Sequence, residues 1–530
     1  MKYKTKKLFS AFSLYTSSLL SGILMGLTVA PFNVWFLAWI ALAPLWVLIV
    51  NSKIPQKQSP LSSSAPPFLL ALAWGIGYHG LALSWITGIH PMTWMGVPWL
   101  ASLGIALFCW TFITLWGAAL VAVWAIAMRT ISSQNGFTRV LIGTALWCGL
   151  EVLWSNGALW WSSLSYTQSP YNLVILHLGQ LSGSSAVTFS IVAVNGLVAE
   201  AWITNRRAAE NAERISSVSL GFVNKYLGVA AALLITLHLI GFSLYSRPLA
   251  QPPETALKIG IIQGNVPNEI KLYPEGFRRA IEGYTTGYLT LANQGINAVL
   301  TPEGALPFFQ RDLKNTSLIS AVQEKGIVAW IGAFGERGRS YTNSLFTFTG
   351  NGEVFSRYDK AKLVPIGEYI PFEEILGGII QRLSPLDEHQ VPGSPNQVFN
   401  TPFGRVIVGI CYESAFSEQF RRQAAAGGQF ILSPSNDAHY SAAMPAQHHA
   451  QDIMRAIETD RWGVRATNTG YSAFVNPHGR TLWISGHNTY ETHAETIYRR
   501  QTQTFYVRWG DWLTPLLLGL AALGWFLERQ

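Results

Sequence analysis

The sequence is poor in charged residues for its length. Only 12% of its 530 residues are charged, whereas soluble proteins average about 25%. In contrast, 49% of the residues are hydrophobic and 21 are Trp. This composition excludes a protein that is soluble along its whole length, so we expect part of the chain to lie in a membrane. The less apolar part has no basic run with interleaved aromatic residues, and we therefore expect no nucleic-acid partner.

Cysteine is also scarce. Two of the three cysteines, Cys109 and Cys148, lie in apolar stretches, and only Cys411 lies in the less apolar part. This excludes a disulfide framework and leaves Cys411 as either an inert core residue or a thiol kept for chemistry. The histidines do not supply a metal-binding pattern either. The spacing of His439, His448 and His449 fits no His-Glu-x-x-His motif, so we expect them at the surface, and we expect no metal and no cofactor.

Apolar residues are distributed unevenly along the chain. They form long blocks up to about residue 247, thin out between residues 255 and 510, and return in the last twenty residues. A linker at 246–255 contains three prolines and marks a boundary. We therefore predict a membrane domain with seven transmembrane helices (1–247), a soluble domain (255–510) and a C-terminal transmembrane helix (511–530). The eight predicted spans are residues 8–30, 31–50, 68–89, 98–128, 138–155, 182–203, 226–246 and 512–527.

The charges of the connecting loops predict an orientation. The loops after the second, fourth and sixth spans carry the positive charge, whereas the opposite loops, near Pro31 and at 90–98 and 155–180, contain no Lys or Arg. By the positive-inside rule both chain ends are cytoplasmic and the soluble domain lies on the other side. The outer loops are rich in aromatic residues, which indicates either an interfacial belt or a lipid-facing floor beneath the soluble domain. The positive residues are Lys53, Lys57, Arg129, Arg139, Arg206, Arg207, Arg214 and Lys225.

The soluble part alternates between patterns typical of strands and of helices, which predicts a layered α/β domain. The apolar stretch 372–380 is either a buried helix or a mobile flap. Predicted strands cover 257–263, 298–301, 327–334, 341–348 with a continuation to 358, 406–411, 430–433 and 464–467. Predicted helices cover 274–294, 313–325, 416–426 and 444–460.

Three chemically useful residues each lie at the end of a predicted strand: Glu303, Lys360 and Cys411. A thiol is largely protonated at neutral pH, so a nucleophilic cysteine needs a base or a nearby cation. Taken singly, a cysteine after a strand is most often a core residue, and a Glu or Lys there is usually solvated. Because all three share one setting in one domain, we predict that Glu303 is the base, Lys360 the cation and Cys411 the nucleophile.

The order Glu303, Lys360, Cys411 in an α/β domain resembles the carbon–nitrogen hydrolase (nitrilase) superfamily, which implies an α-β-β-α sandwich. The flanking sequence is similar to the apolipoprotein N-acyltransferase family, whose members also carry seven helices before this domain and one after it. Two departures are His439-Tyr440-Ser441, where Trp-Phe-Gly is usual, and Leu272, where many members have Trp. The matching motifs are residues 263–266, 301–303, 360–371, 410–413, 435–438 and 508–511.

This resemblance implies a two-step acyl transfer. A phospholipid gives its acyl chain to Cys411 as a thioester, and the N-terminal amino group of a diacylglyceryl-cysteine lipoprotein takes it. Glu303 moves the protons, and Lys360 with a backbone N–H near Cys411 or Tyr412 stabilises the oxyanion. Glu368 and Glu413, otherwise expected to be solvated or salt-bridged, would hold Lys360 or Cys411 in geometry, with Tyr412 in support. The resemblance assigns no substrate-binding residues. The implied location is the bacterial inner membrane with the catalytic domain on the periplasmic face, and we expect a monomer.

Two other functions remain open from the residues. A membrane-tethered amidase or nitrilase would use the same triad with water in place of the amine. A transporter or scaffold with an inactive domain is the second alternative. Charged residues are scarce within the predicted spans, with Glu151 and Glu200 only near their ends, which disfavours a transporter.

Overall fold

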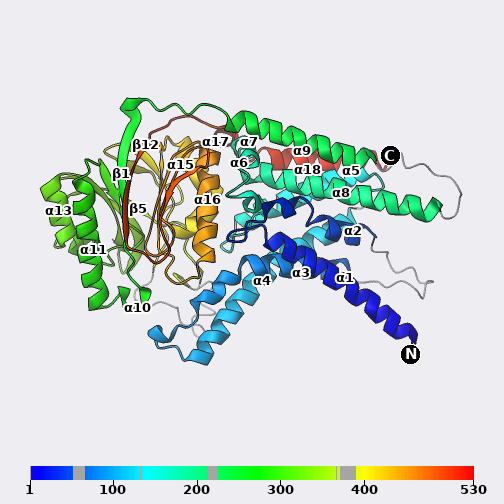
Figure 1. Ribbon diagram of the computed structural model, residues 1–530, viewed down its shortest axis with the longest axis horizontal. Helices are drawn as coiled ribbons and strands as arrows, with labels where there is room; N and C mark the ends of the chain where they lie inside the picture. Colours follow the sequence, from blue (N-terminus) through cyan, green and yellow to red (C-terminus); the bar gives the residue numbers. More distant parts are fainter. Residues whose placement is uncertain (1, 52–65, 132, 213–223, 366, 370–389) are drawn as a thin grey trace.

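The computed structural model describes residues 2–51, 66–131, 133–212, 224–365, 367–369 and 390–530. It shows an elongated molecule made of a helical region and a β-sandwich, which lie at opposite ends of the long axis (Figure 1). The apolar stretch at 372–380, predicted as a helix or a flap, lies outside the described residues.

The helical region holds the apolar part of the chain. Four of its described helices are long and apolar enough to cross a membrane, namely Trp99–Thr130, Gly136–Ser155, Ser184–Arg207 and Lys225–Tyr245. The other predicted spans coincide with shorter apolar helices, so the predicted total of eight crossings is met only in part. The helices are α1 (Lys2–Gly26), α2 (Ala43–Asn51), α3 (Pro67–Ala82), α4 (Trp99–Thr130), α5 (Gly136–Ser155), α6 (Leu173–Leu176), α7 (Gly179–Ser182), α8 (Ser184–Ala212), α9 (Asn224–Tyr245) and α18 (Leu513–Leu527).

The second predicted span, residues 31–50, is not one continuous helix. It divides into a 3-10 turn, η1 (Trp35–Trp39), and α2. The side chain of Asn195 on α8 accepts hydrogen bonds from the backbone N–H groups of Leu42 and Ala43, at 2.9 and 3.0 Å, and donates to the Ala38 carbonyl at 2.8 Å. A buried amide thus satisfies the backbone groups that the interruption leaves without helical partners.

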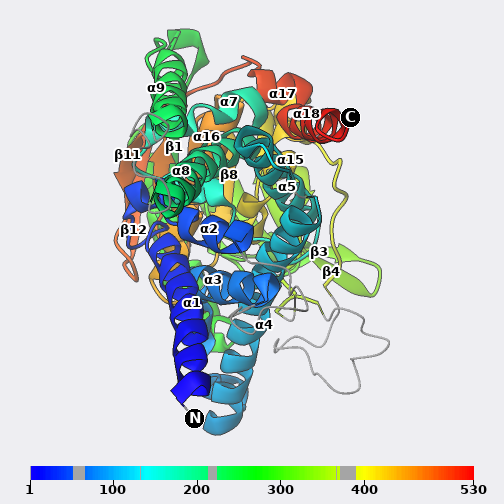
Figure 2. The same ribbon diagram turned by 90° about the vertical axis from the view of Figure 1, so that its right-hand side faces the viewer.

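Tryptophan forms much of the helical core. Trp46, Trp74, Trp124 and Trp147 are fully buried, with ring centroids of the contacting pairs 5.3–5.9 Å apart. Helix α18 returns from the sandwich to pack beside α5, and the two helices lie next to each other in Figure 2. The C-terminal segment therefore completes the helical region, although more than 250 residues separate it from α9.

In the described residues the sandwich consists of two six-stranded sheets that pack face to face, ordered β12-β1-β2-β3-β4-β5 and β11-β10-β9-β8-β7-β6. The inner strands β1–β3 and β7–β9 run parallel, and the outer pairs are antiparallel. The strands are β1 (Ala256–Gln263), β2 (Ala298–Leu300), β3 (Val328–Arg337), β4 (Ser340–Phe348), β5 (Val354–Asp359), β6 (Phe399–Thr401), β7 (Gly404–Val408), β8 (Ile431–Ser435), β9 (Gly463–Thr467), β10 (Ala473–Val475), β11 (Thr481–Ile484) and β12 (Glu491–Tyr498).

Helices cover both outer faces of the sandwich. On the first sheet lie α11 (Pro274–Ala292) and α13 (Ser317–Lys325), and on the second lie α15 (Ser417–Ala425) and α16 (Ala443–Thr459) (Figure 1). This arrangement confirms the predicted α-β-β-α sandwich. The remaining short helices of this part are α10 (Asn268–Lys271), α12 (Gln310–Leu313) and α17 (Phe505–Trp509).

Helix α16 joins the sandwich to the helical region. It is buried from Met444 to Thr459 with the exception of Ala446, because one side covers the second sheet and the other faces the helical region (Figure 1). Gln447 donates to the carbonyls of Ala30 and Ala82 at 2.9 and 2.7 Å, and Ser169 donates to the Ala450 carbonyl at 2.7 Å. The helical region thus forms a further layer against the sandwich.

The strand predicted at 406–411 ends earlier in the structure than the sequence pattern indicated. Strand β7 ends at Val408, and Cys411 begins a short 3-10 turn, η7 (Cys411–Ala415). The backbone of Cys411 has a positive φ of 52°, which is incompatible with a strand. The chain therefore turns at the cysteine itself, whereas the sequence pattern placed the turn after it.

Candidate active site

Three loops that follow strands bring together Glu303, Lys360 and the thiol of Cys411. They follow β2, β5 and β7 respectively. The Glu303 loop lies very close to β3, since a side chain at Gly332 would collide with the Pro302 carbonyl, and Gly304 adopts a positive φ of 52°. All three predicted residues are buried, and the thiol lies within electrostatic reach of both charged groups.

The ammonium of Lys360 bridges two carboxylates. Its Nζ donates to Glu303 Oε1 at 2.8 Å and to Glu368 Oε1 at 2.7 Å. Asn343 also donates to Glu303 Oε1, at 2.7 Å, and the Asn436 backbone N–H donates to Glu303 Oε2 at 2.9 Å. Burial opposes the charge on Lys360, but the two carboxylates outweigh it and raise the pKa of Lys360 well above its ordinary value. Lys360 is therefore a fixed cation.

Cys411 is protonated at rest. Burial and the charge of Glu303 raise the pKa of its thiol well above the ordinary value, and the opposing effect of Lys360 does not cancel this rise. Its left-handed backbone is uncommon for a residue with a side chain, and such strain is frequent at functional sites. Chemistry at this sulfur needs a base that removes the proton as the new bond forms.

Glu413 ties two of the catalytic loops together. It is fully buried, and its Oε1 accepts from the backbone N–H groups of Ala361 and Lys362 at 2.7 and 3.1 Å. Its Oε2 accepts from the N–H of Ile410 at 2.8 Å. One side chain therefore links the segment after Lys360 to the residue before Cys411. Glu413 is thus not the solvated or salt-bridged group that its sequence position first suggested.

Tyr412 points toward the helical region. Its hydroxyl donates to the Ala158 carbonyl at 2.6 Å and accepts from the Trp160 N–H at 3.0 Å. Its ring is parallel to that of Trp161, with centroids 6.2 Å apart. Trp160 and Trp161 are each only 8% exposed. The loop at 155–180 thus packs against the candidate site, which fits a floor beneath the sandwich better than an interfacial belt.

Lys271 is a site residue that the sequence reasoning missed. It is only 9% exposed, and its Nζ donates to the backbone carbonyl of Glu303 at 3.3 Å. Burial lowers the pKa of Lys271 to about 8, against the opposing influence of the Glu303 and Cys411 charges. The sequence feature that could have predicted the burial of Lys271 is its position between the apolar residues Ile270 and Leu272.

Two of the three histidines were wrongly predicted to lie at the surface. His448 and His449 are buried, and His449 Nε2 lies 2.9 Å from Thr481 Oγ1. Ligand atoms of Cys411, Asp437 and His448 lie within 4.8 Å of one another, a spacing short enough for a metal ion. However, His448 Nδ1 lies 3.2 Å from Asp437 Oδ1, and its Nε2 lies 2.8 Å from the Cys411 carbonyl. Both ring nitrogens are therefore already bonded to protein oxygens.

The departures at 439 and 440 retain aromatic contacts. His439, the histidine that does lie at the surface, stacks on Trp94 with centroids 5.9 Å apart. Tyr440 contacts Trp85 edge-on at 5.0 Å. Trp85 and Trp94 belong to the 3-10 turns η2 (Ser84–Ile89) and η3 (Thr93–Met95), so a second segment of the helical region also contacts the sandwich near the site.

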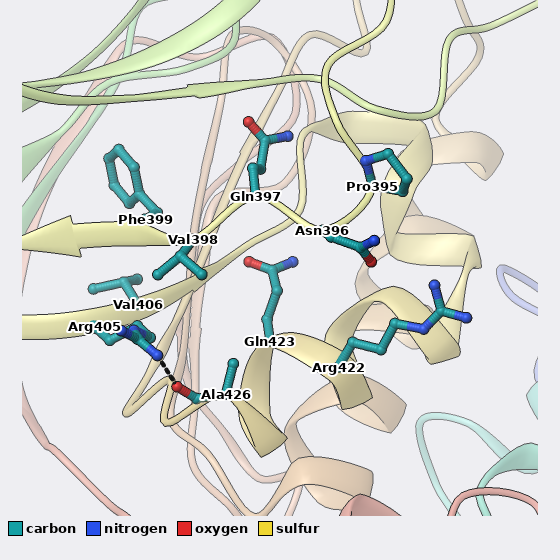
Figure 3. Close-up of a pocket in the computed structure, with 10 residues that line it drawn as sticks. All are labelled: Pro395, Asn396, Gln397, Val398, Phe399, Arg405, Val406, Arg422, Gln423 and Ala426. Carbon is teal, nitrogen blue, oxygen red and sulfur yellow. Dashed lines mark hydrogen bonds between the residues drawn. The ribbon is translucent and has the colours of Figure 1, made fainter.

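A surface cavity of about 220 Å³ contains none of the predicted site residues (Figure 3). Two residues that line the cavity form hydrogen bonds with the strands that precede Lys360 and Cys411. Gln423 exchanges two hydrogen bonds with the backbone of Val408, and Gln397 accepts from the N–H of Asp359, next to Lys360. The chemistry therefore lies elsewhere, and the cavity walls have a supporting role.

Comparisons with known proteins cover both regions. Residues 262–505 match the family model for carbon-nitrogen hydrolase, and residues 21–197 match that for the apolipoprotein N-acyltransferase N-terminal domain. The chain is 70% identical to an apolipoprotein N-acyltransferase from Nostoc sp., covering 95% of this chain and 97% of that one. The corresponding protein of Synechocystis sp. is 47% identical, covering 95% and 98%. A solved mutant of an amidase from Nesterenkonia sp. AN1 aligns with 51% of this chain and 99% of its own, at 19% identity and a TM-score of 0.37.

Proposed function

The chain belongs to the apolipoprotein N-acyltransferase family, and from this premise we propose that Glu303, Lys360 and Cys411 transfer an acyl chain through a thioester on Cys411. The enzyme acylates the N-terminal amino group of lipoproteins. The observation that carries the assignment of residues is the Lys360 ammonium, which bridges Glu303 and Glu368 beside a buried thiol. The match of residues 21–197 to the N-terminal domain of this family disfavours an amidase that uses water.

The first half-reaction acylates the cysteine. Glu303 takes the Sγ proton as the sulfur attacks the ester carbonyl of a phospholipid. Glu303 Oε1 already accepts two hydrogen bonds, whereas Oε2 accepts one, so Oε2 is the oxygen best placed for the proton. Lys360 and a backbone N–H at the turn stabilise the oxyanion. The carbon–oxygen ester bond then breaks, and the lysophospholipid leaves with the proton from Glu303.

The second half-reaction transfers the acyl chain to the amine. The α-amino group of a diacylglyceryl-modified cysteine attacks the thioester carbonyl, and the carbon–sulfur bond breaks as the amide forms. Glu303 accepts the proton that the amine loses, and the Cys411 thiolate recovers it. Glu368 and Glu413 keep Lys360 and the cysteine turn in place, while Tyr412 anchors the site on the loop at 155–180.

The contacts between the two regions support a membrane orientation. All three segments predicted to lie outside contact the sandwich, through Ala30, Trp94 and Ala158. At the opposite end, Ser133 donates to Glu528 at 2.6 Å, and both chain ends lie at that side of the helical region (Figure 1). We propose eight crossings, with the shorter helices included, both termini in the cytoplasm, and the sandwich on the periplasmic face of the inner membrane.

With these eight crossings, the chain divides into three parts. Residues 1–247 form the membrane domain, residues 255–510 the catalytic domain and residues 511–530 the last crossing. The proposed working unit is a monomer, since the described contacts around Lys360 and Cys411 are made by residues of one chain.

The decisive experiment is mass spectrometry of the full-length protein after incubation with phospholipid vesicles. We expect one acyl adduct, on Cys411, which disappears when a diacylglyceryl lipopeptide is added and yields the acylated peptide. Cys148→Ala is the matched control and keeps the adduct. An adduct on another residue, or one that persists with the acceptor present, contradicts the route.

The orientation is tested by labelling single cysteines in a background without the native ones. Arg207→Cys and Asn396→Cys introduce exposed thiols at the two ends of the molecule. An impermeant maleimide applied to spheroplasts is expected to label position 396 only. Labelling of both positions, or of 207 alone, rules out this orientation.

A further inference from the structure

Behind Cys411 lies a row of buried charged side chains that the acyl-transfer route does not use: His448, Asp437, Arg465 and Asp452. His448 and Asp437 are fully buried, and the other two are at most 7% exposed. His448 Nδ1 lies 3.2 Å from Asp437 Oδ1, Arg465 Nη2 lies 3.4 Å from Asp437 Oδ2, and Arg465 Nη1 donates to Asp452 Oδ2 at 2.7 Å. Two basic groups thus alternate with two carboxylates.

The partners of His448 determine its charge. Burial opposes the charge on Asp437, but His448 and Arg465 lower the pKa of the Asp437 carboxyl. Arg465 does so whatever the charge of His448, because its guanidinium is always charged and donates to Asp437 Oδ2 at 3.4 Å. The Asp437 carboxylate therefore only accepts hydrogen bonds, and so does the Cys411 carbonyl, which lies 2.8 Å from His448 Nε2. An imidazole that donates from both nitrogens is an imidazolium.

The bond from Nε2 acts on the nucleophile's own backbone. Cys411 has a left-handed φ of 52°, an uncommon conformation for cysteine. The N–H before it, on Ile410, is held by Glu413 at 2.8 Å, and its carbonyl is held by His448. The turn that presents the sulfur is thus secured on both sides.

A positive charge at His448 also lies near the sulfur. The ligand atoms of Cys411, Asp437 and His448 fall within 4.8 Å of one another. With His448 charged, the row of two basic groups and two carboxylates is neutral overall. With His448 neutral, a net negative charge would face the thiol and oppose its ionisation.

We propose that His448 is a positioning residue for Cys411: its imidazolium holds the left-handed turn by the Cys411 carbonyl and favours the thiolate. This inference rests on the proposed role of Cys411 as the nucleophile. The charged groups that face His448 are Asp437 after β8, Asp452 on its own helix and Arg465 on β9. From the helical region, the ring of Trp161 lies 5.2 Å away and carries no charge.

The test measures the reactivity of Cys411 without any substrate. The full-length protein carrying Cys109→Ala and Cys148→Ala is purified in detergent, and its alkylation by iodoacetamide is followed by mass spectrometry across a pH series. In His448→Gln the side chain keeps an N–H donor but loses the charge. We expect the apparent pKa of Cys411 to rise by about one unit, so that alkylation at neutral pH slows about tenfold. The kcat of acyl transfer should fall while KM is retained.

The matched control is His449→Gln. His449 is the buried neighbour on the same helix, but it contacts Thr481 and not the cysteine turn. Its alkylation profile should coincide with that of the parent. If His448→Gln does not accumulate as folded protein by thermal melting, His448→Asn is measured in the same way with the same expectation.

Two results overturn the proposal. One is an alkylation profile of His448→Gln that coincides with the parent profile. The other is an equal shift in His449→Gln, which reveals a general packing effect. Failure of the proposed function itself is recognised separately, because it appears as acyl transfer by Cys411→Ala and leaves the alkylation comparison unaffected.

Discussion

Glu151 in the helical region and Glu303 in the sandwich are both buried carboxylates, but their hydrogen-bond partners differ. Glu151 accepts from Leu164 N–H, Ser163 Oγ, Thr188 Oγ1 and Trp147 Nε1, all within 3.2 Å and all neutral donors. Glu303 instead shares a lysine with a second carboxylate. Both obey the rule that buried polar groups are hydrogen-bonded. Glu151 holds the loop that bears Trp160 and Trp161, whereas Glu303 is coupled to a cation beside a thiol.

The cysteines repeat this contrast. Cys148 is fully buried in α5 with ordinary helical backbone, and its sulfur lies 3.9 Å from the Ser185 carbonyl. Cys411 is equally well hidden, at 6% exposed, but lies in a strained turn among charged groups. Burial alone therefore does not distinguish the two thiols, whereas the left-handed backbone of Cys411 and the nearby ammonium of Lys360 do.

The largest expected effect separates these two cysteines. Cys411→Ala should abolish acyl transfer, and Cys411→Ser should nearly abolish it, because a hydroxyl is much harder to deprotonate beside Glu303. Cys148→Ala should keep transfer near the parental rate. Transfer of radiolabelled acyl chains to a lipopeptide measures all three variants, and appreciable turnover by Cys411→Ala would refute the thioester.

The next effect compares the two carboxylates. Glu303→Gln should slow acyl transfer by about 10²–10⁴-fold, because the base is lost. Since the charge of Glu303 raises the pKa of Cys411, its removal should lower that pKa, so alkylation below the thiol pKa becomes faster in the same variant. We therefore expect acyl transfer to become slower and alkylation of Cys411 to become faster in Glu303→Gln.

Glu151→Gln is the control for this pair. It should leave the alkylation profile unchanged and cost about 1–3 kcal/mol of stability, because the amide nitrogen faces donors. A transfer rate in Glu303→Gln equal to that of the parent would remove Glu303 from the role of base.

The third comparison concerns two buried cations. Lys360→Met removes an oxyanion donor and should cost about 10²–10³ in rate. Lys360→Arg should fail almost as badly, since a planar guanidinium does not replace a compact ammonium between Glu303 and Glu368. Single-turnover acylation measures both variants.

Arg139→Met provides the contrast in the helical region, because Arg139 pairs with Glu200 at 2.5 Å. Its loss should destabilise the protein by about 3–5 kcal/mol without changing transfer per folded molecule. Thermal melting in detergent gives the stability. A rate defect in Arg139→Met that matches that of Lys360→Met would abolish the distinction between the two regions.

The smallest expected effect concerns Lys271. Its pKa of about 8 in the fold lies below the ordinary value of 10.5, so its burial penalty is full below pH 8 and fades as the pH approaches 10.5. Lys271→Met should therefore stabilise the protein at neutral pH by roughly 1–4 kcal/mol, while transfer slows about tenfold through the lost contact with the Glu303 loop. Melting temperature and transfer rate are measured on one preparation; stabilisation without slowing would make Lys271 dispensable to the reaction.

The strands and long helices were predictable because local patterns encode them. The apolar run at 257–263 became β1, and the helix expected at 444–460 became α16. Edge strand β12 was missed because its sequence, Glu-Thr-His-Ala-Glu-Thr-Ile-Tyr, is polar and is held by pairing with all of β1. The end of β7 was misplaced because the turn at Cys411 depends on distant side chains.

By itself, the sequence determined the apolar spans, the alternating α/β part and the succession of Glu303, Lys360 and Cys411 after strands. These features follow from periodicity and from local residue chemistry. Only the tertiary structure decided which groups share a buried environment. His448 meets Cys411 across 37 positions, and Tyr412 meets Ala158 across 254. Burial and neighbouring charge set the protonation of Lys271, Lys360 and Cys411, and both arise from contacts that no local pattern contains.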